Sequence, residues 1–413
     1  MRSQILEAAQ GKNSKVLVLV GFAEALSAPE VVWSLVDEGF EVIAFARRGR
    51  RSSLHHSRYV TCYEITPPET DLAKGLAELN ALLVSLATSV KESQRVLFPL
   101  DDSAVWMCGR VSLSHGWTLA GPSGVNIDLA LDKSVQIQAA MDAGFKVPRT
   151  FLAETPRDIL NNNIAFPFIL KPAQSVLPIK NRLRKYRTWI CGSREELEKA
   201  LNEWDGAMPL LAQPLINGVG EGVFGLATPG HIRAWSAHKR LRMMNPHGSG
   251  SSACISQKVS EEFIAPIEKL VSTAEWRGLF MIELLRDASG VAWFMEINGR
   301  PWGSMALARR QGLEYPAWNI NLSIGTTVTI AEPLGAPGIV CRHLGRELMY
   351  PIFVLRGPKS KALRKWPSFW KALRDVVTVR RGDFLYNWRR DDPKVLFVDS
   401  YYTLRDQLSK RGR

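Results

Sequence analysis

Residues 15–20 (KVLVLV) form an unbroken apolar run rich in β-branched side chains. Such a run is typical of a strand buried on both faces of a parallel sheet. Gly21 ends it, and residues 29–38 then have the pattern of a helix that Gly39 would close. A second apolar run follows at residues 41–46 (EVIAFA). Because parallel strands need a crossover between them, this order predicts a βαβ unit at the start of a doubly wound α/β sheet.

The same domain continues with strands expected at residues 59–65 and 96–99 and a helix between them at about 71–90. Its first strand–helix turn, residues 21–25 (GFAEA), contains no GxGxxG sequence. The glycines of that motif let the backbone approach a pyrophosphate, so the sequence does not predict a dinucleotide site here.

The chain of 413 residues is too long for one compact domain. Residues 121–124 (GPSG) interrupt the pattern and mark a boundary. We predict a Rossmann-like domain at residues 1–122, a two-lobed α+β domain at 123–336 with lobes at about 123–208 and 209–336, and an extension at 337–413. In the second domain the expected elements are helices at 133–143, 195–204 and 261–277, strands at 150–153, 166–172, 209–216, 223–227 and 232–238, and a glycine-rich turn at Gly218, Gly220 and Gly222.

Composition excludes several classes of protein. Apolar residues make up 46% and charged residues 23%, which is ordinary for a soluble globular chain and excludes disorder, collagen and coiled coil. No apolar run reaches the length of a bilayer span, and the first residues do not resemble a signal peptide. The cysteines are scattered, without a CxxC pair, which favours a reduced, cytoplasmic location: Cys62, Cys108, Cys191, Cys254 and Cys341.

The positive charge is concentrated near the C-terminus. The net charge is +13, and residues 356–413 hold 16 Lys+Arg against 6 Asp+Glu, or +10, which leaves +3 for the rest. This distribution argues against a nucleic-acid groove in the body of the protein and predicts an anionic surface or partner for the extension.

A predicted hairpin holds the most informative polar residues. Strands at 278–286 and 291–297 flank a turn, and each carries one carboxylate, Glu283 and Glu296. Asn298 lies two residues beyond Glu296, so both point to one face of a strand, and Arg300 continues this alternation. Two carboxylates and an amide oxygen suit Mg²⁺. The alternative is a solvated face with ordinary charges, which the following NGRPWG sequence makes weaker.

Two lysines are placed to bind phosphates. Lys133 follows Asp132 at the start of a predicted helix, where the helix N-terminus also attracts anions. Lys171 ends an apolar strand and lies next to Pro172. The alternative for each is an ordinary surface lysine.

Taken in order, these motifs resemble the ATP-grasp superfamily from about residue 5 to 325. The matching segments are DK at 132–133 followed by GFKVPRT at 144–150, FPFILKP at 166–172, LAQPLING at 211–218, and Glu283 with Glu296, Asn298 and Arg300 in the pattern E…EIN.R. The resemblance is closest to the branch of carboxylate–amine/thiol ligases and carbamoyl-phosphate-synthase-like enzymes.

The resemblance implies roles for these residues. Lys133 and Lys171 would bind the phosphates of ATP, Gln213 and the backbone around Leu215 would read adenine, and Glu221 would bind ribose. Glu283, Glu296 and Asn298 would hold two Mg²⁺ ions, with Mn²⁺ as an alternative, and Arg300 would stabilise the transferred phosphoryl group.

Two segments depart from the family pattern. Pro214 replaces a frequent glutamate at the hinge and lacks an N–H. Residues 173–187 (AQSVLPIKNRLRKYR), in place of a glycine-rich loop over the phosphates, contain no glycine and five basic residues. We expect either a basic lid over the triphosphate or a disordered solvated loop.

A third basic cluster could bind the acceptor. On a strand, His238, Arg240 and Arg242 would share one face and suit a carboxylate or phosphates, the alternative being a solvated face. Residues 245–252 (NPHGSGSS) are expected to form a flexible loop beside it. Cys254 has no neighbour that would activate a thiol.

The extension contains a basic amphipathic segment at residues 355–374. Its apolar side chains could share one helical face: Trp366, Phe369, Trp370 and Leu373. A helix docked on the body through these side chains is the favoured interpretation. An interfacial membrane helix is the second and a nucleic-acid contact the third. Short strands and a closing helix are expected over residues 384–406.

These observations predict an ATP-dependent ligase that activates a carboxylate as an acyl phosphate and joins it to an amine, releasing ADP and phosphate. Alternatives are a kinase of the same fold and a non-catalytic nucleotide-binding scaffold at a membrane. The expected partners are a small or conjugated carboxylate and an amine, without nucleic acid. Contact with the inner membrane surface through residues 356–413 and a homodimer are left open.

Overall fold

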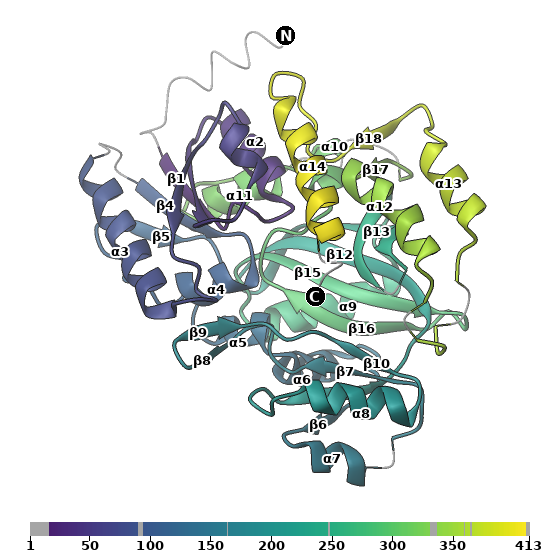
Figure 1. The fold of residues 1–413 in the computed structure, drawn as a ribbon. Coiled ribbons are helices and arrows are strands. Elements are labelled where there is room, and N and C mark those ends of the chain that lie inside the picture. Colours follow the sequence, from purple (N-terminus) through teal and green to yellow (C-terminus); the bar gives the residue numbers. More distant parts are fainter. Residues whose placement is uncertain are drawn as a thin grey trace.

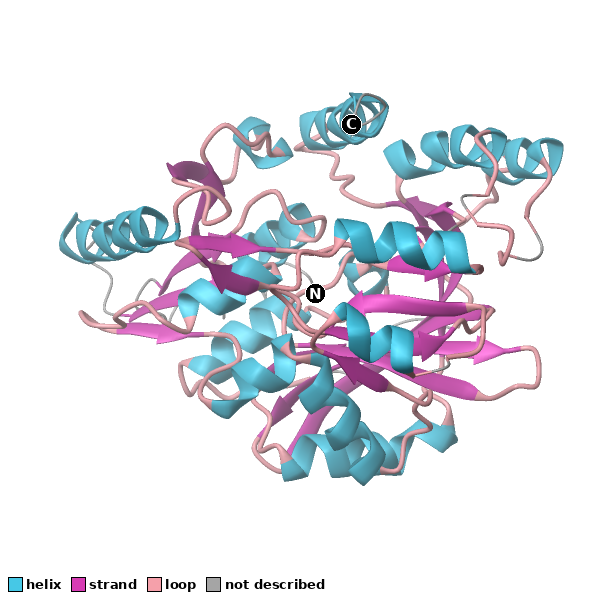
Figure 2. Ribbon diagram, turned by 60° about the horizontal axis from the view of Figure 1, so that its bottom comes forward, coloured by secondary structure: helices cyan, strands magenta, loops and turns pink. Residues whose placement is uncertain are grey.

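The computed structural model of the protein describes residues 16–89, 94–162, 164–246, 248–330, 337–358, 360–363 and 366–409. Three main sheets organise it: a parallel sheet at the N-terminal end, a small antiparallel sheet, and a large sheet between them and the C-terminal helices (Figure 1). Helices lie on either side of the strands (Figure 2).

The N-terminal sheet confirms the predicted doubly wound unit. Its strands are all parallel, and β1 is central and buried along its whole length, as its apolar sequence requires. The order is β3 (Thr61–Ile65), β2 (Glu41–Arg47), β1 (Val16–Gly21), β4 (Gln94–Pro99) and β5 (Trp117–Leu119), with helices α2 (Ala28–Asp37), α3 (Leu72–Ser89) and α4 (Asp102–Cys108). Lys15 and Val90, which the sequence included in these elements, lie outside the described residues.

The next lobe contains helix α6 (Lys133–Ala143), whose bounds agree with the prediction. The Asp132 side chain caps its first turn by accepting from Ser134 and Val135, and Gly144 ends it at φ 98°, a left-handed conformation that suits glycine. The small antiparallel sheet has the order β10 (Trp189–Cys191), β7 (Phe168–Pro172), β11 (Leu210–Pro214) and β6 (Phe151–Ala153), with helices α5 (Val125–Leu131), α7 (Pro156–Asn161) and α8 (Arg194–Glu203).

The large sheet is antiparallel except at its last pair of strands. Its order is β16 (Ala292–Asn298), β15 (Gly278–Asp287), β12 (Gly218–Thr228), β13 (His231–Asn245), β14 (Ser249–Gln257), β17 (Val340–Arg342) and β18 (Asp383–Leu385), with helices α9 (Glu261–Thr273), α10 (Met305–Arg310) and α11 (Tyr315–Ser323).

Two expectations about this sheet were wrong. The glycines at 218, 220 and 222 lie within β12 instead of forming a turn. In the predicted loop at 245–252, Asn245 ends β13 and residues 249–252 begin β14, while His247 lies outside the described residues. The glycines serve close packing, because a Cβ on Gly220 would lie 2.6 Å from Cδ of Arg240, and one on Gly218 would lie 2.6 Å from the carbonyl oxygen of Arg286.

The basic segment at 173–187 is an ordered hairpin of β8 (Leu177–Ile179) and β9 (Arg182–Arg184). Its turn docks on the N-terminal domain, where the Asn181 side chain accepts from the Ala73 N–H at 2.8 Å and donates to Asp71 at 3.0 Å. Leu183 is fully buried, and its N–H donates to the carbonyl of Pro68 at 2.7 Å. The segment is therefore ordered and held by the neighbouring domain, and its action as a lid over the triphosphate stays a prediction.

The C-terminal extension belongs to the folded body. It supplies β17 and β18 to the large sheet, and its helices are α12 (Leu344–Leu355), α13 (Phe369–Val377) and α14 (Lys394–Ser409) (Figure 1). Asp392, just before α14, reaches the N-terminal domain, where it accepts from Nε1 of Trp33 at 3.1 Å and from the Ser57 hydroxyl at 2.5 Å. The extension thus ties the first domain to the large sheet.

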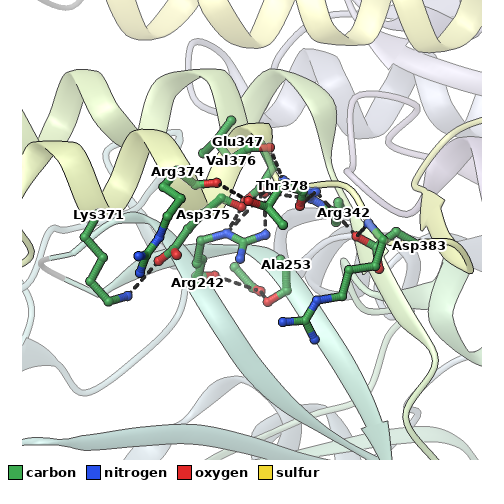
Figure 3. A network of polar contacts seen from close by, with 12 residues as sticks. Arg242, Ala253, Arg342, Glu347, Lys371, Arg374, Asp375, Val376, Thr378 and Asp383 are labelled. Atoms are coloured by element: carbon green, nitrogen blue, oxygen red, sulfur yellow. Dashed lines mark hydrogen bonds and ion pairs between the residues drawn. The ribbon is translucent and has the colours of Figure 1, made fainter.

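A buried ion network connects the extension to the sheet (Figure 3). Glu347 of α12 accepts from Arg242 of β13 at 2.5 Å and from Arg342 of β17 at 2.9 Å. Arg342 also donates to the carbonyls of Val376 and Thr378, at the end of α13, at 2.5 and 2.8 Å.

Within the described part of the chain, no helix has the length and apolarity needed to cross a membrane. The five cysteines are all unpaired thiols, as the sequence predicted.

Candidate active site

A cavity of about 1190 Å³ lies between the two lobes and the N-terminal domain. The predicted site residues that line it are Lys133, Lys171, Gln213, Leu215, Arg240, Glu283, Glu296, Asn298 and Arg300. A second hollow of about 1090 Å³, beside β13 and α9, is lined by none of the predicted residues. The first cavity is therefore the candidate active site.

The hairpin of β15 and β16 brings the two predicted carboxylates together. Glu283 and Glu296 are direct cross-strand partners, and Asn298 follows on the face of Glu296. The Asn298 amide donates to Glu296 at 3.1 Å. Spacing along the chain placed these residues on one hairpin, and the pairing register places them opposite each other.

Cations neutralise both carboxylates. Arg240 of β13 donates to Glu283 at 2.5 Å, and Nζ of Lys133 lies 3.7 Å from an oxygen of Glu296. Burial alone would raise the pKa of Glu296, but Lys133 and the Asn298 amide hold it below its usual range. Glu296 is therefore anionic, as a carboxylate must be to bind a metal ion.

The oxygen atoms of Glu283, Glu296 and Asn298 fit a hard cation such as Mg²⁺. Among the described residues, no group of three or more His, Cys, Asp or Glu side chains could hold a metal ion. A metal held by two carboxylates and one amide needs further oxygens from water or phosphates, which is how Mg²⁺ commonly binds with nucleotides.

Lys171 extends into the same cavity from the end of β7. It is 9% exposed, and its Nζ donates to the carbonyl of Met295 at 3.4 Å. Burial lowers the pKa of this lysine to about 8, although Glu296 opposes the shift. Lys171 is therefore a buried lysine of the cavity and not the ordinary surface lysine of the alternative interpretation.

Arg300 connects the hairpin to the N-terminal domain. Its Nε donates to Asp102 at 2.5 Å, and Nζ of Lys185, from the docked hairpin, lies 3.8 Å from the other oxygen of Asp102. Although burial alone would raise it, the pKa of Asp102 lies below its usual range because Arg300 and Lys185 lie beside it. Three separate parts of the chain thus meet at one carboxylate.

The sequence matches no family model and no curated protein. Solved structures do match. An L-amino acid ligase from Bacillus licheniformis has a TM-score of 0.58 at 15% identity, over 76% of this chain and 75% of that one. The ADP complex of purK, an N5-carboxyaminoimidazole ribonucleotide synthetase, has a TM-score of 0.60 at 14% identity, over 87% and 95%.

A third match is the biotin carboxylase domain of the Hydrogenobacter thermophilus 2-oxoglutarate carboxylase, with bound MgADP, ADP and bicarbonate. Its TM-score is 0.58 at 17% identity, over 78% of this chain and 72% of that one. The chain has the ATP-grasp fold. The resemblance drawn from the sequence motifs is therefore confirmed at the level of the fold.

At the hinge of this ATP-grasp fold, two predicted groups are already bound within the protein. The Gln213 amide donates to the hydroxyl of Thr150 at 2.7 Å, and the Leu215 N–H donates to the carbonyl of Pro167 at 3.1 Å. The Leu215 N–H is therefore already bonded in this conformation, and adenine recognition by Gln213 and the backbone around Leu215 stays a prediction. The carbonyl groups of the hinge and the Gln213 carbonyl oxygen stay as candidates.

Glu221 was predicted as a ribose ligand. The structure places its side chain on the face of β12 that points away from the cavity. It accepts from Nε of Arg286 at 3.0 Å, and the same arginine also binds Glu262 of α9. The error arose because Glu221 was assigned to a turn. On a strand its neighbours Gly220 and Gly222 face the opposite way.

His238 and Arg242 also do not line the cavity. His238 is 4% exposed, stacks edge-on against Phe224, and its Nδ1 lies 2.8 Å from the Ser304 hydroxyl. Burial, with a smaller effect of Arg240, holds the pKa of His238 well below its usual range, so it is neutral. A β-bulge between Arg240 and Arg242 turns the latter away, toward Glu347.

Several residues that line the cavity were not predicted from the sequence. Asp102 follows the parallel strand β4, and a carboxylate at the carboxyl end of such a strand was a usable signal. Ser360 and Leu363 of the extension also line the cavity, and the Ser360 hydroxyl donates to Glu196 at 2.9 Å. Nothing in their local sequence indicated this long-range contact.

Gln136 of α6 holds strand β16 in place. It is 2% exposed, its amide nitrogen donates to the carbonyl of Ile297 at 2.8 Å, and its amide oxygen accepts from the Ile297 N–H at 3.2 Å. Ile297 lies between Glu296 and Asn298, so this clamp positions both side chains.

Gln136→Leu is expected to lower the free energy of unfolding by about 2–4 kcal/mol, because two buried backbone groups lose their partners. We expect a lower midpoint in urea unfolding and weaker Mg²⁺-dependent nucleotide binding. Gln138→Leu on the exposed side of the same helix is the matched control. Equal stability of the two variants would contradict the clamp.

The pKa of Lys171 predicts a pH dependence of ATP binding. Phosphates favour the charged lysine, so binding should take up a proton near pH 8, and ATP affinity should fall as the pH rises through about 8. The pKa of this lysine in the folded protein lies below the ordinary 10.5. Between pH of about 8 and 10.5 the unfolded chain therefore binds more protons, and the contribution of Lys171 to stability rises with pH. Calorimetry in buffers of different ionisation heat measures the proton uptake, and Lys171→Met should abolish it.

Proposed function

We propose that the chain is an ATP-dependent, ADP-forming ligase that activates a carboxylate and joins it to an amine. The observation that supports this most directly is the convergence of Lys133, Lys171, Arg240 and Arg300 with the paired glutamates in one cavity. The chain shares its fold with an L-amino acid ligase, with the ADP complex of an N5-carboxyaminoimidazole ribonucleotide synthetase and with a biotin carboxylase domain solved with MgADP. This fold is compatible with the proposed reaction.

The first step would be attack of a substrate carboxylate oxygen on the γ-phosphorus of ATP. An O–P bond forms, the bond to ADP breaks, and an acyl phosphate results. Lys133 and Lys171 would neutralise the phosphates, and Arg300 would stabilise the transferred group, since positioned cations do most of the work in phosphoryl transfer. Mg²⁺ bound by Glu283, Glu296 and Asn298 would neutralise the triphosphate further.

In the second step the amine would attack the acyl carbon. A C–N bond forms, phosphate leaves, and the nitrogen loses a proton. Arg240 is the cation nearest to Glu283, and we assign it to the acceptor side of the cavity together with Arg300. Asp102, which links Arg300 and Lys185, would hold the N-terminal domain and the docked hairpin over the reacting groups.

A kinase that phosphorylates a stable acceptor is the second candidate, because the same cation set would serve it. A non-catalytic scaffold is disfavoured because the lysines, glutamates and arginine of the site occur together in one cavity. A cytoplasmic location and a homodimer stay predictions.

The test is a screen of carboxylates paired with amines in which ADP and phosphate release are both measured with Mg²⁺. The ligase predicts release of both products that depends on the acid and the amine, and an amide by mass spectrometry. A phosphorylated product without phosphate release would indicate the kinase. Formation of AMP and pyrophosphate would refute the proposed chemistry.

A further inference from the structure

One side of helix α13 is used to dock on the protein. Ala372 is fully buried and forms a small core with Tyr350 and Val354 of α12, against which Phe369 and Val376 also pack. Just before the helix, Nε1 of Trp366 donates to the carbonyl of Val354 at 2.9 Å. Docking therefore uses only part of the apolar face that the sequence predicted.

The opposite side of α13 exposes large apolar groups. Trp370 is 76% exposed and Val377, seven residues later, is 66% exposed, so both lie on one face of the helix. Val379, 70% exposed, lies two residues beyond the end of the helix. Exposed apolar side chains of this size indicate a contact surface when they cluster.

Exposed cations lie close to these groups along the chain. Lys371, Arg374, Arg380 and Arg381 are all exposed. The acidic residues of this segment are already paired, since Asp375 lies 2.7 Å from Nζ of Lys371 and Asp383 lies 3.4 Å from Arg342. Within the described residues, Arg374, Arg380 and Arg381 form no ion pair at 4.0 Å or less.

The C-terminal end of α13 is fixed to the large sheet. Arg342 of β17 binds backbone carbonyls of Asp375, Val376 and Thr378, and Glu347 holds Arg342 in turn (Figure 3). A helix whose end is fixed to the central sheet does not have to become ordered when a partner binds, which lowers the cost of association.

We propose that this surface binds an anionic phospholipid membrane. We call it the α13 surface and define it as Trp370, Val377, Val379, Arg374, Arg380 and Arg381. Tryptophan and valine would enter the headgroup boundary while the arginines pair with lipid phosphates, as in interfacial helices. The charge of residues 356–413 fits an anionic partner, and a flat lipid surface suits one short docked helix. The proposal is independent of the proposed catalytic function.

The test is flotation of the full-length protein with vesicles of phosphatidylcholine mixed with phosphatidylglycerol, and with vesicles of phosphatidylcholine alone. We expect binding only to the anionic vesicles, and we expect added salt to weaken it because exposed charges are screened. Trp370→Ala and the pair Arg380→Gln with Arg381→Gln should each lower the vesicle affinity by about tenfold or more.

A matched control is Phe397→Ala combined with Arg390→Gln. Phe397 is 63% exposed on α14, and Arg390 is exposed as well, so this variant removes similar groups elsewhere. It should bind vesicles like the unmodified protein. Equal binding to neutral and anionic vesicles, or wild-type affinity in the α13 variants, would overturn the proposal. Binding to soluble heparin that requires the arginines but not Trp370, without vesicle binding, would also overturn it by identifying a soluble polyanion.

Discussion

Glu296→Gln is expected to reduce ADP release by about a thousandfold with the carboxylate and amine that the screen identifies. The side chain keeps its volume but loses the negative charge that faces Lys133 and that a metal ion needs. Before a substrate is known, the same variant should abolish the Mg²⁺ dependence of nucleotide affinity in calorimetry, because one of two carboxylates of the site is gone.

Glu221→Gln is the matched control for this prediction. It removes a glutamate from the same sheet, but on the face that binds Arg286 and away from the cavity. We expect nearly unchanged ADP release. A similar loss in both variants would show that the metal assignment of Glu296 is wrong and that the charge acts on the fold.

Glu347→Leu is expected to lower the free energy of unfolding by about 3–5 kcal/mol. Glu347 is 3% exposed and bridges Arg242 and Arg342 (Figure 3). Without it Arg242 has no other ion-pair partner among the described residues, and a buried cation without a partner is costly. The urea midpoint measures the loss, and the nucleotide affinity of the folded protein should change little.

Asp375→Asn provides the comparison for a surface ion pair. Lys371 is 59% exposed in its side chain, so its pair with Asp375 should contribute only about 0.5 kcal/mol. A loss for Asp375→Asn as large as that for Glu347→Leu would contradict the view that burial decides the value of these pairs.

Local sequence patterns predicted most of what lies within one element or one hairpin. The helix of α6 has predicted ends because Asp132 and Gly144 are strong capping residues. The strand that carries Lys171 and the hairpin that carries Glu283 and Glu296 were predicted because apolar runs and turn residues act over a few neighbours.

Predictions failed where a residue's role depended on a distant partner. Glycines at 218–222 are typical of a turn, but strand β13 packs the side chain of Arg240 over Gly220 and keeps the segment extended. Arg242 was expected beside Arg240, but a bulge opposite β14 rotates it toward α12. Neither the pairing register nor the bulge has a signal in the local sequence.

The extension illustrates the same limit for charge. Counting residues located its excess of cations but could not tell which of them are bound internally. The fold separates Arg342, buried against Glu347, from Arg380 and Arg381, which stay exposed.

By itself the sequence predicted the first βαβ unit, the ATP-grasp motifs and the residue types of the candidate metal and phosphate site, because each depends on spacing along the chain. Only the tertiary structure decided that Asp102, Lys185, Gln136 and Ser360 belong to or support that site, and that Glu221, His238 and Arg242 do not line it. The physical reason is that side-chain direction follows from strand register and from packing between distant segments, and these contacts form only when the chain has folded.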